Sequence, residues 1–180
     1  MKTIFKSFKF RIYPNKEQEI LLAKHFGACR FVFNHYLNKR KETYLEDKKS
    51  LNYYDNANDL TQLKKDENYI WLKEINSQSL QSSLRNLDTA YGKFFRKQTK
   101  FPRFKSKYDR QSFKIPQFVK IENNELILPD LLVDTNNGEI LLINYFASED
   151  ATPESYWGIY TNNSWNIMSF SGGGSSFLND

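Results

Sequence analysis

The chain has 180 residues and a formal net charge of +5, but this charge is unevenly divided. Residues 1–129 carry all 26 Lys and Arg side chains and 14 acidic ones, a net charge of +12, whereas residues 130–180 carry seven acidic side chains and no basic one. Hydrophobic residues at 39% and aromatic residues at 16% exclude a disordered basic tail, and the single cysteine excludes an internal disulfide. The basic excess predicts a polyanionic partner, because neutralising phosphates releases counterions.

No apolar run reaches the length of a membrane span, and lysines interrupt the first ten residues, where a signal peptide would need an apolar core. One cysteine also falls short of the four ligands that a structural zinc site normally takes. We therefore expect a cytoplasmic protein without metal, cofactor or small-molecule substrate. Composition leaves its oligomeric state open.

The first elements follow from local patterns. Alternation of apolar and basic side chains over residues 8–12 predicts a strand, which Pro14 ends. Asn15 and Gln18 have the spacing of a capping box and predict the start of a helix. We expect Gly27 to break or kink this helix, so that residues 29–44 form a second amphipathic helix.

The next helices are predicted over residues 55–65 and from Asn76 or Ser77 to residue 95. The second of these has an almost unbroken apolar face, a basic opposite surface and a basic exit that Pro102 turns away from the helix. Strands are expected at residues 112–115, 119–121 and 125–128, the last two joined by a hairpin at Asn123 and Asn124. Further strands are expected within residues 140–146, 156–160 and 165–170, before a flexible Gly/Ser end.

Several segments occur in a specific order: FKFRIYP at 8–14, CRFVFN at 29–34, WLKEI at 71–75, SQSLQ at 77–81, and FFRK at 94–97 leading to FPRFK at 101–105. Together they resemble the N-terminal half of the TnpB (OrfB) proteins of insertion sequences, which are RNA-guided DNA nucleases. The resemblance covers roughly residues 5–129. It implies an α+β fold in which a split β-barrel, the wedge, is interrupted by a helical bundle described as a helix-turn-helix.

On this basis we expect four regions: a first wedge strand at 1–14, a helical recognition region at 15–107, further wedge strands at 108–129, and an acidic β-rich extension at 130–180. The family continues into a nuclease domain with three metal-binding carboxylates and a zinc ribbon, and the sequence shows neither. We assign no catalytic role to the acidic residues of the extension, which sit among turn residues.

The resemblance also implies that a few residues read a short motif beside the target, namely Tyr53 or Tyr54, Lys73, Ser77 and Gln81, with Gln78 next to them on the same helix. Glutamine can pair bidentately with adenine, and serine or lysine can contact phosphates. The remaining expected nucleic-acid contacts are basic: Lys9, Arg11, Arg85, Lys93, Arg96, Lys97, Lys100, Arg103 and Lys105.

Each assignment has a structural alternative. Ser77 is also a suitable helix cap, Lys9 and Arg11 also serve as solubilising groups, and a charge run such as residues 93–107 is often only a solvated surface. We interpret His25 and His35 as structural and Cys29 as a small buried apolar side chain. Trp157 and Trp165 we interpret as packing residues.

The sequence therefore predicts a fragment of a TnpB-like transposon protein that binds transposon-end RNA, duplex DNA or both, without cleaving them. Two alternatives stay open at this point. One is an inactive transposon remnant, and the other is an interaction protein whose acidic extension masks the basic surface.

Overall fold

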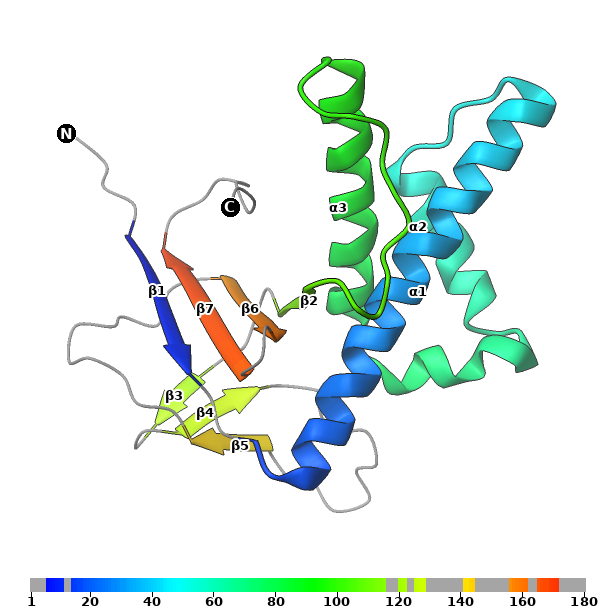
Figure 1. Ribbon diagram of the computed structural model, residues 1–180. Coiled ribbons are helices and arrows are strands. Elements are labelled where there is room, and N and C mark those ends of the chain that lie inside the picture. The colour runs from blue at the N-terminus through cyan, green and yellow to red at the C-terminus, as the bar shows by residue number, and fades with distance from the viewer. Residues whose placement is uncertain are drawn as a thin grey trace.

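The computed structural model describes the backbone of residues 6–11, 14–115, 120–122, 125–128, 141–144, 156–161 and 165–171, and the side chains of residues 14–115. Its helical part consists of α1 (Lys16–Asp47), α2 (Tyr53–Leu63), the 3-10 helix η1 (Glu67–Glu74) and α3 (Ser77–Phe95). Figure 1 shows α1 and α3 packed beside each other, with the described strands to one side of them.

Each α-helix has an asparagine as its N-cap, immediately before its first residue. Asn15 and Gln18 exchange side-chain-to-backbone hydrogen bonds of 2.9 Å in each direction, which confirms the predicted capping box of α1. Asn52 forms the same kind of box at α2. At α3 the cap is Asn76, whose Oδ1 accepts from the backbone of the second and third residues of the helix, so the alternative in which Ser77 is the cap is wrong.

The predicted break at Gly27 is also wrong, because α1 runs uninterrupted through that position for 32 residues. Glycine in a helix interior costs about 0.5–1 kcal/mol relative to alanine. Its neighbours Phe26, Ala28 and Cys29 are all buried in the core, and this packing outweighs the local cost.

The core lies where α1, α3 and β2 (Gln111–Ile115) meet. Its fully buried members come from α1, η1, α3 and β2: Leu22, Val32, Tyr36, Leu37, Leu72, Leu80, Leu84, Leu87 and Ile115. Small side chains at the crossing bring the backbones close. Ser83 Oγ donates to the Cys29 carbonyl at 2.9 Å, and Ser79 Oγ donates to the Lys114 carbonyl at 2.8 Å, so α3 is tied to both α1 and β2.

The described strands form two antiparallel groups. One has the order β1 (Lys6–Arg11), β7 (Trp165–Ser171), β6 (Tyr156–Thr161), β2, and the other has the order β3 (Lys120–Glu122), β4 (Glu125–Leu128), β5 (Leu141–Asn144). The pairing of β3 with β4 confirms the predicted hairpin partners, although its turn lies outside the described residues. Strands β6 and β7 of the extension stand between β1 and β2. The split barrel and its four regions stay predictions.

Candidate nucleic-acid interface

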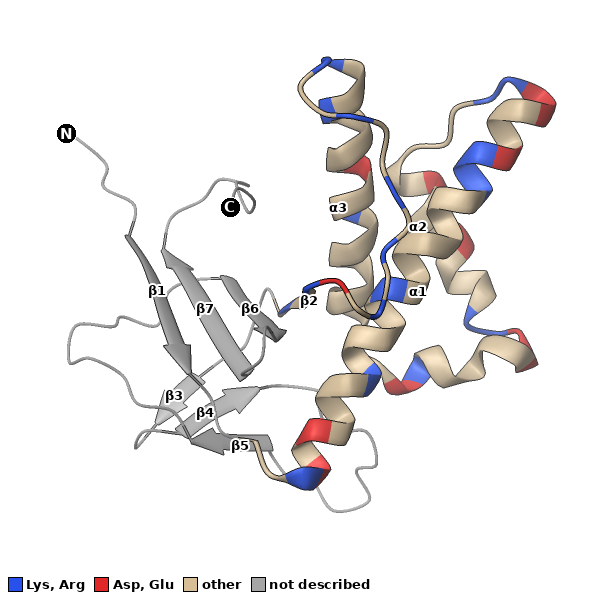
Figure 2. Ribbon diagram, viewed as in Figure 1, with Lys and Arg blue, Asp and Glu red and all other residues tan. Residues whose placement is uncertain are grey.

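Basic side chains gather around the end of α3 and the chain that follows it. Residues 93–110, called here the basic segment, contain eight Lys and Arg residues and a single acidic one, Asp109. Figure 2 shows these basic positions at the end of α3 and along residues 98–110, called here the return, which run back beside α1 to β2. The path of this segment determines which of its charged side chains face solvent.

The turn that ends α3 is a Schellman motif. The Lys97 N–H donates to the Phe94 carbonyl at 2.8 Å, and the Gln98 N–H donates to the Lys93 carbonyl at 2.9 Å. This motif requires a left-handed residue, and Lys97 supplies it with φ of 59°. Glycine is the usual residue there because a side chain in this conformation costs roughly 1–2 kcal/mol. Lys97 therefore occupies a position where the backbone conformation is unfavourable for a lysine.

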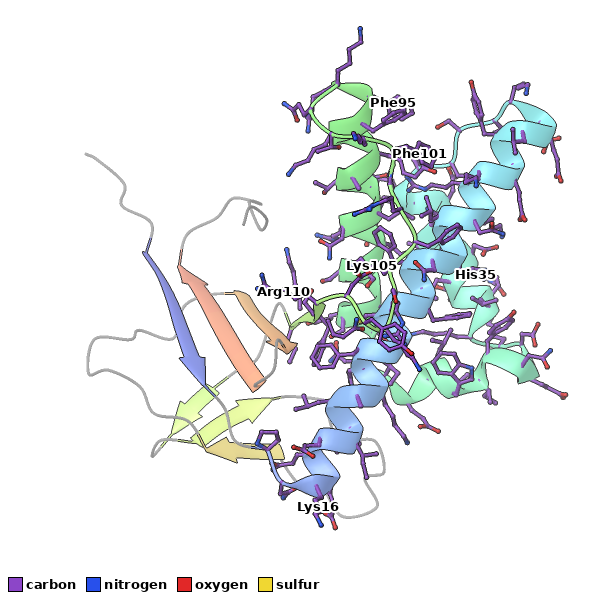
Figure 3. The ribbon with its side chains drawn as sticks, in the orientation of Figure 1. Lys16, His35, Phe95, Phe101, Lys105 and Arg110 are labelled. Atoms are coloured by element: carbon purple, nitrogen blue, oxygen red, sulfur yellow. The ribbon has the colours of Figure 1, made fainter. Side chains whose placement is uncertain are left out.

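Aromatic rings hold the returning chain against α3. The Phe101 ring packs edge-on against the rings of Tyr91 and Phe94, with centroid distances of 5.5 and 5.3 Å. Phe94 also contacts Phe95 at 5.4 Å. The apolar face predicted for α3 is buried through Leu87, but Phe95 beyond it is 67% exposed, because the helix there extends past the core. Figure 3 shows Phe95 and Phe101 near this end of α3.

Asn34 of α1 fixes the middle of the basic segment. Its Nδ2 donates to the Lys105 carbonyl at 2.9 Å, and its Oδ1 accepts from the Lys105 N–H at 2.8 Å, so one amide side chain satisfies both backbone groups of that residue. One turn earlier, Arg30 Nη1 donates to Gln111 Oε1 at 2.6 Å. The CRFVFN and FPRFK segments quoted above are therefore in direct contact, and together they set the path of the return.

Lys105 is half-buried, unlike most of the basic segment. Its Nζ lies 4.3 Å from the centroid of the Phe33 ring, and burial lowers the pKa of its ammonium group. Arg96, Lys97, Lys100 and Arg103 are exposed, and Lys93 is half-buried. The exposed cations are thus carried on a backbone that Asn34 and the aromatic contacts hold in place.

Arg40 is basic but not a surface group. It is only 5% exposed, and its Nη2 lies 3.0 Å from Asp88 Oδ1. With the Asn56 amide oxygen turned toward the guanidinium, that oxygen accepts from Nη2 at 2.8 Å and Nε at 2.6 Å, and the charge also lies over the Tyr91 ring. Arg40 therefore joins α1, α2 and α3.

The residues expected to read a motif lie toward the other end of α3, a helix about 28 Å long. Ser77, Gln81 and Arg85 are exposed and share one stripe, and Gln78 beside them is half-buried. Arg85 lies over the Tyr53 ring, 5.2 Å from its centroid, and the exposed Tyr54 ring is 5.3 Å from Tyr53.

One further expected residue, Lys73, lies apart from this stripe, and one basic residue near the stripe, Lys64, was not expected. Lys73 is exposed on η1, and Lys64 Nζ donates to the Ser77 hydroxyl at 3.2 Å. The structure thus divides the expected residues into two groups, one at each end of α3. The side chains of Lys9 and Arg11 lie outside the described residues.

Sequence reasoning missed two residues of this surface. Arg110 continues the charge run past residue 107, and counting the run to its end would have found it. The role of Asn34 carried no such signal, because its partner is 71 residues away.

The two histidines and the cysteine make packing and hydrogen-bond contacts within the fold. His25 Nδ1 donates to the Leu21 carbonyl at 2.9 Å, and its Nε2 accepts from the Asn76 N–H at 3.4 Å, while burial lowers its pKa. The His35 ring packs on Phe31, and burial lowers its pKa as well. Cys29 is buried, as expected, and burial raises the pKa of its thiol to about 12.

An open hollow of about 420 Å³ lies between α1 and α2, and Lys39 and Asp59, which form an ion pair of 2.6 Å, are among the residues that line it. Within the described part of the chain, no three His, Cys, Asp or Glu side chains converge as metal ligands would. No helix in that same part is long and apolar enough to cross a membrane.

The fold and this surface define a helical module, joined to strands, that presents fixed cations and exposed aromatic rings. Comparison with known proteins identifies which module it is. Residues 1–49 match a family model described as a helix-turn-helix domain of OrfB proteins of IS605 type. In this structure the matched residues contain β1 and the single continuous helix α1.

The chain is 41% identical over 127 residues to InsQ of Escherichia coli K12, named as a candidate RNA-guided DNA endonuclease, covering 69% of this chain and 32% of that protein. It is 37% identical over 107 residues to a Streptomyces pristinaespiralis protein with the same kind of name, covering 59% and 27%. It is 34% identical over 116 residues to the virulence protein VsdF of Salmonella dublin, covering 59% of this chain and 98% of VsdF.

The chain belongs to the TnpB/OrfB family, as its sequence motifs predicted. It spans about a third of the length of InsQ and about a quarter of the Streptomyces relative.

Proposed function

We propose that this chain is a nucleic-acid-binding module of a TnpB-like transposon protein, and that it binds RNA or DNA through phosphates without cleaving the strand. The observation that carries the proposal is the basic segment: eight cations and one carboxylate on a backbone clamped by Asn34 and Phe101. A fixed array of this kind loses little entropy when it binds a polyanion.

The position of Lys97 supports the proposal, whereas its left-handed backbone alone does not, because Lys48 at the end of α1 has the same conformation. A lysine at this turn contributes a cation at the apex of the basic segment, where a glycine would contribute only a relaxed backbone.

The second group of residues supports a reading role for the first half of α3. An α-helix fits the major groove of duplex DNA, and its exposed polar side chains then face base edges. Ser77, Gln81 and Arg85 form such a stripe, and the Tyr53 ring steadies the Arg85 guanidinium. In this proposal the basic segment positions the nucleic acid and the stripe reads it.

The test is the salt dependence of binding by full-length protein carrying Arg96→Ala and Lys97→Ala, measured by fluorescence anisotropy on a labelled duplex. Each lost phosphate contact lowers the slope of log K against log salt by roughly 0.9, so we expect a slope lower by about 1–2 and weaker binding. The control is Lys16→Ala with Lys65→Ala, which removes the same charge outside the basic segment.

Equal slopes and affinities for the double variant and the unchanged protein would refute the assigned surface. The absence of cleavage is tested separately, by incubating labelled RNA and DNA with the protein and Mg²⁺. Shortened products that increase with protein concentration and persist through repurification would refute binding without cleavage.

A further inference from the structure

Four aromatic rings of the basic segment are exposed, and three of them are more than half exposed. Phe95 is 67% exposed, Phe104 is 51% exposed and Tyr108 is 86% exposed. Each is flanked in sequence by a basic residue: Arg96, Arg103 with Lys105, and Lys107. Single exposed rings are common on proteins, but three within fourteen residues of the most basic segment form a recurring pattern of ring beside charge.

The backbone that carries these rings is ordered by specific contacts. Phe95 ends α3 beside Phe94, and Phe104 precedes the residue that Asn34 clamps. Tyr108 sits in a turn in which the Ser106 N–H donates to Asp109 Oδ2 at 2.8 Å and the Tyr108 N–H donates to Ser106 Oγ at 3.2 Å.

The side chain of Gln111 closes the same turn, because its Nε2 donates to the carbonyls of Ser106 at 2.9 Å and Asp109 at 2.6 Å. The backbone that carries the rings therefore follows a fixed path. Figure 3 shows that this path runs from Phe95 past Lys105 to Arg110.

Resting on the function proposed above, we propose that the basic segment takes a single strand, whose unpaired bases stack on Phe95, Phe104 and Tyr108 while the neighbouring cations contact its phosphates. Stacking needs an open base face, which a duplex hides inside its helix, and every base has such a face, so the site would tolerate many sequences. The charge of the segment favours a polyanion over an apolar protein partner.

The experiment compares three labelled probes of equal length by fluorescence anisotropy: an oligothymidylate strand, an abasic strand with the same phosphates, and a duplex. The variant is full-length protein with Phe95→Leu, Phe104→Leu and Tyr108→Leu, which keeps apolar side chains and charge but removes the ring faces. Phe101 is left intact because it packs against Tyr91 and Phe94. Circular dichroism and the unfolding midpoint verify that the variant folds.

Removing a stacking ring weakens binding by about 5- to 150-fold per base. We expect the ring variant to lose at least about tenfold for oligothymidylate, with an unchanged salt slope, and to bind the abasic strand as the unchanged protein does. The unchanged protein should prefer oligothymidylate to the abasic strand by a similar factor.

If the unchanged protein binds all three probes equally, or if the ring variant binds oligothymidylate normally, the stacking inference is overturned while phosphate binding stands. If the unchanged protein binds none of the probes, the proposed function falls as well. Equal losses by the ring variant on the thymidylate and abasic strands would also overturn stacking, because an abasic strand has no base to stack.

Discussion

The lysine at the end of α3 yields a prediction in which stability and binding change in opposite directions. Lys97 has φ of 59° and closes the Schellman turn. Lys97→Gly removes a conformational cost of roughly 1–2 kcal/mol, while the greater freedom of glycine in the unfolded chain offsets about 0.4–1 kcal/mol of this gain. We expect a net stabilisation of about 0.5–1 kcal/mol, or roughly 1–4 °C in unfolding midpoint.

The same substitution removes a cation that we place against phosphate, so nucleic-acid binding should weaken and its salt slope on duplex should fall by about 0.9. Urea unfolding and anisotropy at several salt concentrations measure the two effects on one preparation. The matched control is Lys48→Gly, since Lys48 closes α1 with φ of 58° but lies outside the basic segment. It should gain similar stability without losing affinity.

Two results would refute this reasoning. A Lys97→Gly protein that is less stable than the unchanged one would show that the left-handed lysine is held by favourable contacts rather than tolerated at a cost. Equal loss of binding in the Lys97 and Lys48 variants would show that total charge, and not the basic segment, governs affinity.

Four further predictions concern the scaffold. Asn34→Ala should lower the free energy of unfolding by about 1–3 kcal/mol and raise the rate of amide hydrogen exchange at residues 101–106. The control Asn38→Ala loses one exposed hydrogen bond to a neighbouring side chain and should lower that free energy by under about 0.5 kcal/mol. Arg40→Met should lower the free energy of urea unfolding by about 2–4 kcal/mol, because it leaves the Asn56 amide oxygen buried without a hydrogen-bond donor. An unchanged free energy would contradict the role of Arg40 in joining the three helices. Burial lowers the pKa of His25 from 6.5, so as pH falls the unfolded chain binds this proton before the folded chain does, and the free energy of unfolding should fall below about pH 6.5. The fall should be shallower in His25→Gln. Identical pH profiles for the two proteins would exclude this histidine as the cause. Gly27→Ala should raise stability by about 0.5–1 kcal/mol, since nothing outside its own helix lies within 4 Å of the added Cβ; destabilisation would show that the glycine is needed for close packing.

The parts of the fold that rest on local chemistry could be predicted from the sequence. Asn15 and Gln18 are three residues apart, so their reciprocal bonds follow from spacing alone. The stripe that buries Leu80, Leu84 and Leu87 follows from the helical period in the same way.

The misses have physical causes. Local propensity suggested a break at Gly27, but propensity is weak beside the packing of the residues around it. The helix η1 is short and 3-10, with a three-residue period that resembles neither helix nor strand in an apolar pattern. Periodicity also could not show that Phe95 lies beyond the core and in solvent.

The candidate site was predictable in composition but not in arrangement. The charge run near residue 100 is visible by counting, whereas the clamp by Asn34 depends on a contact between residues far apart in the chain. The division of the expected residues between the two ends of α3 likewise follows only from the packed structure.

The unbroken course of α1 has a consequence for how such chains can vary in length. A residue inserted between Asn34 and Arg40 would rotate one of them relative to the other by about 100° and shift it by about 1.5 Å, so the two could not both keep their partners. The connections between helices have no such coupling to the clamp. Related chains should therefore gain and lose residues between Lys48 and Asn52 and between Lys64 and Asp66, while the spacing from Arg30 to Arg40 stays constant.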